Sequence, residues 1–493
     1  MKHFLIIPLG GLGKRFLYDG YKTYKPFLKI SKNTRIIDNI VNNFPKKNTH
    51  IIIIGNEKKF KNITNNFKRK NTSFIKIKNH NSGPLYSIFL AKEKIKKIVK
   101  DKSFFISYSD INWKWNFSNV IKNIFNKKIV VFSHQSFHPH LDVDPRADFF
   151  ITNKSGELKK VSEKKTINKD YKKDKLAIGC YFFNNFNFFE NFFRLKNFKK
   201  IAKKKEIYII NLLNYCLKNK TKINHFRINK FVHLGVPSQY EDFINWQNVI
   251  TTNLKQNLNL NYPNFMLMAG KGKRLKSLNT KKPFLKFIKQ EIYQYIFKKF
   301  SSKRNYIITN KNYSKSINKR FKTFNIQKTK SMLQTVEKSI DIFKKDNFFI
   351  LSCDCFGDFD SKKFKKFIKL KKPDVVLFTF KISKLQRLLS NSHTTIKIFK
   401  NKIKSISVKK FTNQKNEFGH AGFFWVKNKS VFNNLDNFNS NIKIKREILL
   451  DDYFKFLFDK KLCKVKHFEL NTYTHVGSIK EYFELKYWED YFL

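Results

Sequence analysis

One sequence pattern occurs twice, in the same order, in the two halves of this 493-residue chain. Near the start, an apolar segment is followed by GGLGKR (10–15) and YKPFLKI (24–30). In the second half, FMLMA (265–269) is followed by GKGKR (270–274) and KKPFLKF (281–287). A repeat constrains the fold more than any single motif, because each copy must form the same structural unit. The pattern predicts a tandem duplication.

Three further segments repeat in the same order downstream. They are SFFISYSD (103–110) with NFFILSCD (347–354), GCYF (179–182) with GFFW (422–425), and HLGVPSQYEDFINW (233–246) with HVGSIKEYFELKYW (475–488). Between the two copies lies TTNLKQNLNLNYPN (251–264), a polar stretch typical of a linker. We therefore expect two domains, at residues 1–250 and 262–493.

Within each half, short apolar segments alternate with Lys-rich segments. HIIIIG (50–55), SFFISYS (103–109), KIVVFS (128–133) and IGCYFF (178–183) are typical of short buried strands. IFLAKEKIKKIV (88–99) has apolar residues three and four apart, which predicts an amphipathic helix. Alternating strands and helices predict an α/β fold, in which helices connect mainly parallel strands.

The charge of the chain is extreme, but its distribution argues against a nucleic-acid partner. Lys and Arg number 102 and Asp and Glu 36, which gives a net charge of +66. The basic residues are mostly Lys and are spread along the whole chain, whereas specific recognition of nucleic acid favours clustered Arg. Lys, Asn, Ile and Phe are abundant together, which indicates a compositional bias. We therefore expect no specific nucleic-acid partner.

The remaining composition favours a folded protein in a reducing compartment. Hydrophobic residues make up 41% of the chain, which is enough for buried cores. No apolar run approaches the roughly 18 residues of a membrane span, and no signal peptide is recognisable. The 5 cysteines are scattered and form no CxxC pair. We expect a cytoplasmic protein without a transmembrane segment; the sequence leaves open whether it forms a homo-oligomer.

Each copy of the repeat combines groups that suit a triphosphate. A glycine-rich turn after a strand lets backbone N–H groups approach phosphates, and Arg15 and Lys25 follow the first turn as Arg274 and Lys282 follow the second. Arg binds phosphate through a two-pronged fork, and Lys acts as a point charge. Asp110 and Asp354 each follow a predicted strand, where a carboxylate suits Mg²⁺ shared with substrate phosphates.

Together, GGLGKR, YKPFLKI, Asp110, Glu163-Lys164, GCYFF and HLGVPSQYEDF resemble the sugar nucleotidyltransferase family, also called the NTP-transferase family. The stretch SFHPHLDVDPRADFF (136–150) is similar to a subgroup associated with surface-polysaccharide biosynthesis. The resemblance covers most of residues 1–248 and, more weakly, 262–493. It implies two tandem Rossmann-like α/β domains with mainly parallel mixed sheets. It also implies that an NTP and a sugar 1-phosphate react, with Mg²⁺, to give an NDP-sugar and pyrophosphate.

The resemblance also implies roles for residues of this chain. Arg15, Lys25, Lys164, Arg274 and Lys282 would be catalytic, and Lys164 would hold the sugar phosphate. Glu163, Gly179 and Lys409 would bind the substrate, with Glu163 holding sugar hydroxyls. Gly10, Gly11, Gly13, Gly83, Gly270 and Gly272 would bind the nucleotide, and Asp110, Asp354 and Asp452 would bind the metal.

The two copies depart from the family pattern in different ways. Where the family usually supplies a second metal-binding Asp, the first copy has Asn211 and the second has Asp451 and Asp452. Conversely, SEKKT in the first copy becomes SVKKF in the second, which keeps Lys409 but loses the Glu. The sequence therefore leaves open whether both halves turn over substrate.

Other functions stay open at this point. A cytidylyltransferase acting on a phosphorylated alcohol or amino compound would use the same groups. A glycosyltransferase is disfavoured, because neither SDIN (109–112) nor CDC (353–355) contains its Asp-x-Asp metal motif. One half, or both, could instead be a nucleotide-binding scaffold. The base and the sugar are not determined by the sequence.

Overall fold

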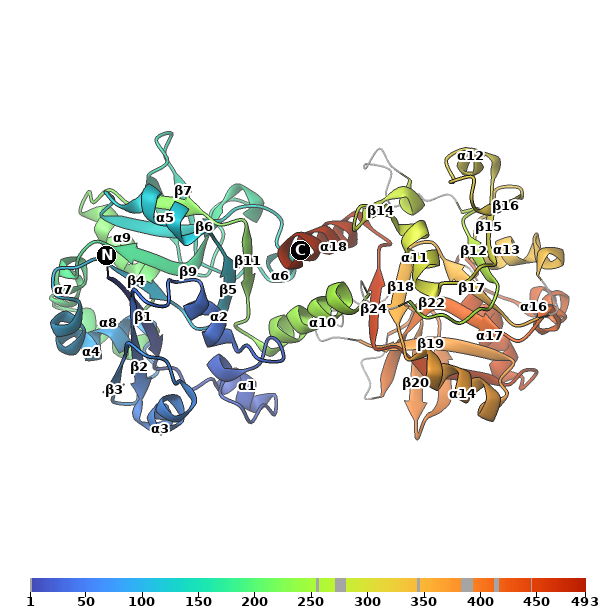
Figure 1. Ribbon diagram of the computed structural model, residues 1–493, viewed down its shortest axis with the longest axis horizontal. Coiled ribbons are helices and arrows are strands. Elements are labelled where there is room, and N and C mark those ends of the chain that lie inside the picture. The colour runs from blue at the N-terminus through green and yellow to red at the C-terminus, as the bar shows by residue number, and fades with distance from the viewer. Residues whose placement is uncertain are drawn as a thin grey trace. The chain divides into compact units, whose positions relative to one another are not determined.

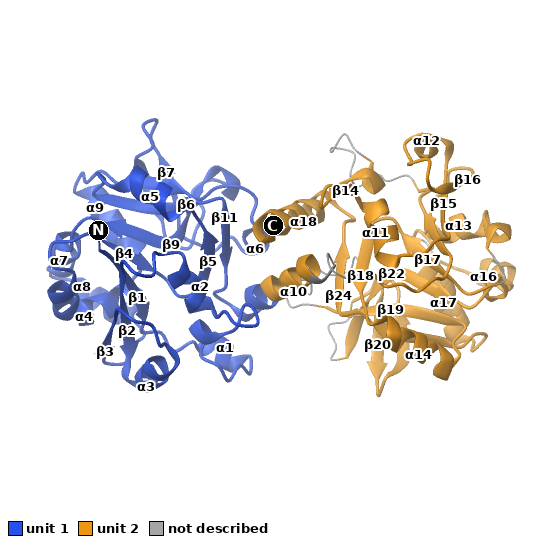
Figure 2. Cartoon of the chain, in the orientation of Figure 1, with its two compact units in different colours: residues 1–241 blue, residues 242–493 orange. Residues whose placement is uncertain are grey.

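In the computed structural model the chain forms two compact units, residues 1–241 and 242–493 (Figure 2). The structure describes residues 2–253, 257–270, 281–343, 346–382, 393–411, 416–444 and 446–493. The division between the units falls inside helix α10 (Pro237–Asn253), earlier than the boundary expected at residue 250. The polar stretch after α10 leads into the first strand of unit 2.

Unit 1 is built on a nine-stranded mixed sheet. Its strands are β1 (His3–Leu9), β2 (Thr49–Asn56), β3 (Thr72–Ile77), β4 (Phe104–Ser107), β6 (Ile129–His134), β7 (Phe149–Thr152), β8 (Leu158–Ser162), β9 (Lys175–Phe183) and β10 (Asn224–Arg227). The main path runs β10-β6-β9-β4-β1-β2-β3, and β5 (Ile111–Lys114) pairs separately with β11 (Lys230–His233). Only β9 and the β7–β8 hairpin pair in antiparallel fashion in the nine-stranded sheet.

The helices of unit 1 connect these strands and cover the sheet (Figure 1). They are α1 (Lys14–Tyr18), α2 (Ile36–Asn42), α3 (Glu57–Asn66), α4 (Pro84–Val99), α5 (Phe117–Ile124), α6 (Pro139–Val143), α7 (Asn187–Phe193), α8 (Phe198–Lys204) and α9 (Ile209–Lys218). Helix α4 begins at Pro84, a residue favoured in the first helical turn. Its residues Leu85, Ile88, Ala91 and Ile95 are buried at helical spacing. They pack with α7, α8 and α9 in one hydrophobic core on the sheet.

Unit 2 has a second nine-stranded sheet, and its strands are arranged in the sheet in the same order as those of unit 1. Its strands are β12 (Asn264–Leu267), β15 (Asn305–Thr309), β16 (Lys322–Asn325), β17 (Phe348–Ser352), β19 (Val375–Lys381), β20 (Thr395–Phe399), β21 (Lys402–Ser407), β22 (Glu417–Val426) and β23 (Val465–Glu469). The main path β23-β19-β22-β17-β12-β15-β16 corresponds strand for strand to that of unit 1. The pair β18 (Cys355–Asp358) and β24 (Thr472–His475) corresponds to β5 and β11.

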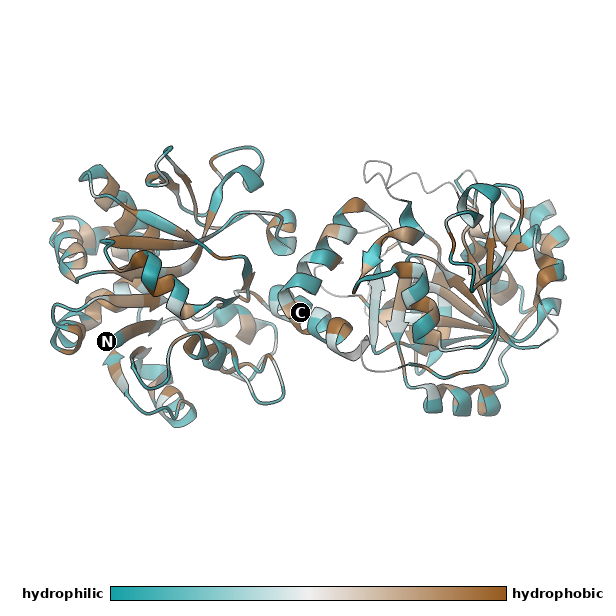
Figure 3. Cartoon of the chain, turned by 45° about the horizontal axis from the view of Figure 1, so that its top comes forward, coloured by the Kyte–Doolittle hydropathy of each residue, from teal (hydrophilic) through white to brown (hydrophobic). Residues whose placement is uncertain are grey.

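Its described helices are α11 (Ile292–Phe300), α12 (Lys311–Ser314), α13 (Met332–Glu337), α14 (Ser361–Lys371), α16 (Leu435–Asn441), α17 (Leu450–Asp459) and α18 (Ile479–Phe492); a short hairpin joins β13 (Lys286–Phe287) to β14 (Gln290–Glu291). Figure 3 shows the central strands of both sheets at the hydrophobic end of the scale, whereas hydrophilic residues cover much of the helices. The predicted α/β fold class is therefore confirmed. Among the described helices, none has the length and hydropathy needed to cross a bilayer.

Candidate active site

A cavity of about 300 Å³ lies where β1 and β4 of unit 1 end. These strands pair in parallel, so their carboxyl ends meet at the same edge of the sheet. The cavity is lined by residues 8–16, 24–26, 80–81, 83–84 and 108–110, together with Glu206, Tyr208 and Gly235. The fold thus brings together Gly10, Gly11, Gly13, Arg15, Lys25, Gly83 and Asp110, which the sequence nominated from four separate segments.

Lys25 and Asp110 form an ion pair in the wall of this cavity. Lys25 Nζ donates a hydrogen bond of 3.0 Å to Asp110 Oδ2, across 85 positions of the chain. Burial raises the pKa of the Asp110 carboxyl, but the charge and hydrogen bond of Lys25 more than offset this, and the pKa lies below its ordinary value. Burial lowers the pKa of the nearby His233 imidazole to about 4. Asp110 is therefore ionised, and Lys25 is the cation that contacts it.

Two polar residues hold the glycine-rich loop in place. The Tyr24 hydroxyl contacts the carbonyl oxygens of Leu9 and Gly11 at 3.0 and 2.7 Å. The buried Asn56, at the end of β2, donates from Nδ2 to the Gly10 carbonyl at 2.8 Å. Sequence reasoning missed both residues. Their only sequence signals are that Tyr24 directly precedes Lys25 and that Asn56 ends a predicted strand.

Gly83 lines the cavity, and it also has a structural reason to be glycine. Its φ is +84°, and an added Cβ would lie 2.6 Å from the Ile207 carbonyl oxygen and 2.7 Å from the Ile207 nitrogen. Ile207 N donates to the Ser82 carbonyl at 2.8 Å, and Leu85 N donates to the Ile207 carbonyl at 3.1 Å. The segment before α4 therefore lies against the segment before α9 at a distance that no side chain at position 83 permits.

The residues nominated for the sugar phosphate lie next to the cavity. Lys164 adopts a left-handed backbone, with φ 51°, and its Nζ lies 3.4 Å from Glu206 Oε2 and 4.4 Å from the centre of the Tyr208 ring. Glu206 and Tyr208 both line the cavity. Glu163 Oε2 accepts a hydrogen bond of 2.8 Å from Asn211 Nδ2. Asn211, which stands where the family usually has a second metal-binding Asp, thus orients Glu163.

Gly179 positions a residue of the cavity wall rather than lining the cavity. Its φ is +89°, and an added Cβ would lie 2.9 Å from Tyr108 Cδ2. Tyr108 lines the cavity, and its hydroxyl accepts a hydrogen bond of 3.0 Å from the backbone nitrogen of Ile209. Glycine at position 179 therefore leaves room for the Tyr108 ring in the wall.

The corresponding cavity of unit 2 is larger, at about 890 Å³. It is lined by residues that include Gly270, Lys282, Asp354, Lys409 and Gly477. Lys282 Nζ contacts Asp354 Oδ2, which repeats the Lys25–Asp110 pair of unit 1. Lys409 has a φ of 49°, close to that of Lys164. Gly272 and Arg274 lie outside the described residues.

Asp354 forms a second ion pair besides the one with its lysine. His475 Nε2 lies 3.2 Å from Asp354 Oδ2, and His475 Nδ1 lies 3.0 Å from Glu481 Oε1. Burial by itself lowers the pKa of His475, but the two carboxylates raise it to about 9. Burial raises the pKa of Asp354, but Lys282 and His475 together hold it well below its ordinary value. In unit 1 the position of Glu481 is taken by the uncharged Gln239. Gln239 accepts a hydrogen bond from the Gly235 nitrogen, as Glu481 does from the Gly477 nitrogen.

Asp452, nominated as a metal ligand, is absent from the described residues that line the cavity with Asp354. It lies in the first turn of α17, where Oδ2 accepts a hydrogen bond of 2.8 Å from the Leu449 backbone nitrogen. Arg446 binds both of its carboxylate oxygens, at 2.6 and 2.8 Å. Asn211 occupies the same capping position of α9. The structure therefore gives Asp452 the role of a helix cap and ion-pair partner.

The residues of unit 1 fit Mg²⁺ bound together with a substrate. Mg²⁺ is commonly held by one or two carboxylates, several waters and substrate phosphates. Asp110 supplies an ionised carboxylate at the strand ends, and Gly10, Gly11 and Gly13 leave the adjoining wall free of large side chains. A triphosphate lying along this loop would share the ion with Asp110.

No protein-family model matches this sequence, and no match is found among curated proteins. Several solved structures each match about half of this chain. They include a nucleoside-diphosphate-sugar pyrophosphorylase from Vibrio cholerae RC9, with 18% identity, a TM-score of 0.40, and coverage of 49% of this chain and 99% of that one. Another is a putative glucose-1-phosphate thymidylyltransferase from Bacillus anthracis, with 15% identity, a TM-score of 0.41, and coverage of 50% and 94%. A third is the inositol-1-phosphate CTP transferase from T. maritima, with 19% identity, a TM-score of 0.37, and coverage of 47% and 97%.

Proposed function

We propose that this chain is a nucleotidyltransferase that joins an NTP to a sugar 1-phosphate, releasing pyrophosphate, and that unit 1 carries the reaction. The observation that carries the proposal is the Lys25–Asp110 pair, 3.0 Å apart, in one cavity with the glycine-rich loop and Arg15. A glycine-rich loop, two cations and one ionised carboxylate match the needs of a metal-bound triphosphate. The shared strand order of the two units supports a tandem duplication of this domain.

The residues act by position and charge. The loop of Gly10, Gly11 and Gly13 would bind the phosphates through backbone N–H groups, and Arg15 and Lys25 would neutralise charge on the departing pyrophosphate. Mg²⁺ held by Asp110 would supply further charge neutralisation at the phosphates. An oxygen of the sugar phosphate attacks the α-phosphorus in line. The new P–O bond forms as the bond to pyrophosphate breaks, so no protein nucleophile is needed.

Glu163 and Lys164 would hold the acceptor. Lys164, beside Glu206 and Tyr208 of the cavity wall, would bind the sugar phosphate, and Glu163, oriented by Asn211, would accept hydrogen bonds from sugar hydroxyls. The resemblance of residues 136–150 further favours a role in surface-polysaccharide biosynthesis. The five free cysteines favour a cytoplasmic location.

Pyrophosphate release tests this function directly. The full chain is incubated with Mg²⁺, each of ATP, GTP, CTP, UTP and dTTP, and a panel of sugar 1-phosphates, and the product is identified by mass. One productive pair supports the proposal. Turnover only with CTP and a phosphorylated alcohol or amino compound identifies the cytidylyltransferase alternative, and the absence of pyrophosphate with every pair contradicts both.

One observation favours a different role for unit 2. Asp354 is engaged by both Lys282 and His475, whereas Asp110 is contacted by Lys25 and has an uncharged histidine nearby. A carboxylate between two cations attracts Mg²⁺ less. We therefore propose unit 2 as a nucleotide-binding scaffold, which Lys282→Met tests: turnover at the wild-type rate supports the scaffold, and a loss equal to that of Lys25→Met contradicts it.

A further inference from the structure

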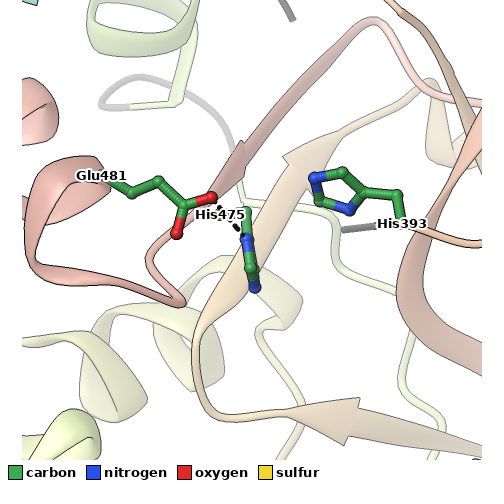
Figure 4. A group of neighbouring side chains, drawn as sticks. All are labelled: His393, His475 and Glu481. Atoms are coloured by element: carbon green, nitrogen blue, oxygen red, sulfur yellow. Dashed lines mark hydrogen bonds and ion pairs between the residues drawn. The ribbon is translucent and has the colours of Figure 1, made fainter. Parts of the chain in front are cut away.

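Three side chains of unit 2 meet outside the residues assigned to nucleotidyl transfer. His393 lies just before β20, His475 ends β24, and Glu481 lies in the first turn of α18. One potential ligand atom from each lies within 4.8 Å of those of the other two, and all three residues are partly buried. Figure 4 shows the His475 ring between the Glu481 carboxylate and the His393 ring.

Hydrogen bonds and ring packing hold these side chains in place. Glu481 Oε2 accepts hydrogen bonds of 2.9 Å from both the Gly477 backbone nitrogen and the Ser478 hydroxyl. This leaves Oε1 directed at His475 Nδ1, 3.0 Å away. The His393 ring packs against the ring of His475, with centroids 5.2 Å apart, and against Phe380 at 5.7 Å. Such prior ordering lowers the entropy lost when an ion binds.

The donor set has a definite chemical preference. Two imidazole nitrogens and one carboxylate oxygen suit Zn²⁺ and similar divalent transition metals, whereas Mg²⁺ prefers oxygen ligands alone. Three protein ligands also leave a coordination position for water or another small ligand. Unit 1 lacks this set, because Gln239 occupies the position of Glu481 and its amide is a poor metal ligand.

We propose that unit 2 binds one divalent transition-metal ion of the Zn²⁺ class through His393, His475 and Glu481. The ion takes the place of the proton between His475 Nδ1 and Glu481 Oε1, and binding releases that proton. His475 Nε2 lies 3.2 Å from Asp354, which lines the cavity of unit 2, so the ion lies beside that cavity. This site is independent of the Mg²⁺ proposed at Asp110.

Co²⁺ is the probe for the test, because its visible spectrum reports the coordination geometry. The full chain is first treated with a chelator, then titrated with Co²⁺ and afterwards with Zn²⁺ as competitor. Wild-type protein is expected to bind one equivalent with the intense visible bands of four-coordinate Co²⁺, and Zn²⁺ should abolish them. Glu481→Gln and His393→Gln are each expected to lose this equivalent.

Glu481→Gln is the sharper variant, because it installs the residue type that unit 1 carries at this position. The amide oxygen can still accept the hydrogen bond from Gly477, as Gln239 does from Gly235 at 3.0 Å. Its metal-free unfolding temperature shows whether the fold is kept. The matched control is His50→Gln, which replaces a partly buried histidine of unit 1 that is hydrogen-bonded to Ser73. This variant should bind Co²⁺ as wild type does. The proposal is overturned if Glu481→Gln and His393→Gln both bind Co²⁺ as wild type does, or if the wild-type chain binds none. Either result stands whatever the outcome of the pyrophosphate assay.

Discussion

Replacing Lys25 by Met should impair catalysis far more than the same change at a nearby exposed lysine. Lys25 Nζ lies 3.0 Å from Asp110 Oδ2, and its side chain is only 17% exposed, so the charge is poorly screened by water. In the complex with substrate, Lys25 would make a charge-assisted hydrogen bond to a phosphate. Such a bond contributes about 1.5 to 3 kcal/mol, which corresponds to roughly 10- to 100-fold in kcat/KM. Met keeps most of the apolar stem, which isolates the loss of charge.

The loss of kcat/KM would be larger if the unpaired Asp110 carboxylate also weakened nucleotide binding. Without Lys25, the Asp110 carboxylate would repel any triphosphate that arrives without its metal ion. The assay is pyrophosphate release at saturating Mg²⁺, together with the rise in unfolding temperature caused by the nucleotide. Lys22→Met, three positions away and exposed, is the matched control and should stay within about twofold of wild type. A Lys25→Met protein with wild-type kcat/KM and an unchanged thermal shift would refute the assignment of this cavity as the active site.

Three further predictions concern other residues. Gly83→Ala should lower the stability of unit 1 by more than about 2 kcal/mol, because the new Cβ would meet the Ile207 backbone. Denaturant unfolding measures this loss. In the control Gly156→Ala, at a φ of +80° with no atom within 4 Å of the added Cβ, only the cost of the backbone conformation should appear. Glu163→Gln should reduce kcat/KM for the sugar phosphate about tenfold with nucleotide binding unchanged, and an equal loss in nucleotide affinity would contradict its role. Burial raises the pKa values of Asp242 and Glu484, and the charge of Asp242 raises that of Glu484 further, so the folded state holds protons that the unfolded state releases as the pH rises above the ordinary carboxyl range. The contribution of this pair to stability should therefore be lost between about pH 5 and pH 8. Over that range Glu484→Gln should gain at least about 1.4 kcal/mol of stability relative to wild type, and the exposed control Asp490→Asn should show no such gain.

The strands and loops that form the cavity could be predicted from the sequence because their signals are local. The apolar segment predicted at 50–55 is β2 (Thr49–Asn56), and the helix predicted at 88–99 is the later part of α4 (Pro84–Val99). Asp110 was recognisable as a strand-end carboxylate, and it follows β4 closely. Parallel pairing of β1 and β4 then brings Asp110 to the glycine loop, as strand order alone requires.

The roles that depend on long-range contacts could not be predicted. Gly83 is required by the approach of Ile207, and Gly179 by the Tyr108 ring, and neither neighbour is adjacent in the sequence. Asp452 fitted a metal ligand by position, but a carboxylate in the first turn of a helix is equally suited to capping, and only the structure shows Arg446 beside it. The boundary between the units falls inside a helix, where the sequence has no linker signal.

The difference in charge around Asp110 and Asp354 can be traced to one position. Gln239 lies four residues after Gly235, and Glu481 lies four residues after Gly477. Each side chain accepts a hydrogen bond from the backbone nitrogen of its glycine. Only Glu481 brings a charge, and it lies 3.0 Å from His475, which in turn contacts Asp354. Asp354 is therefore neutralised from two sides, whereas among the described residues Asp110 forms an ion pair with Lys25 alone. Since Mg²⁺ must compete with these cations for the carboxylate, the metal-bound triphosphate should favour Asp110, and Glu481→Gln should bring the Mg²⁺ affinity of unit 2 closer to that of unit 1.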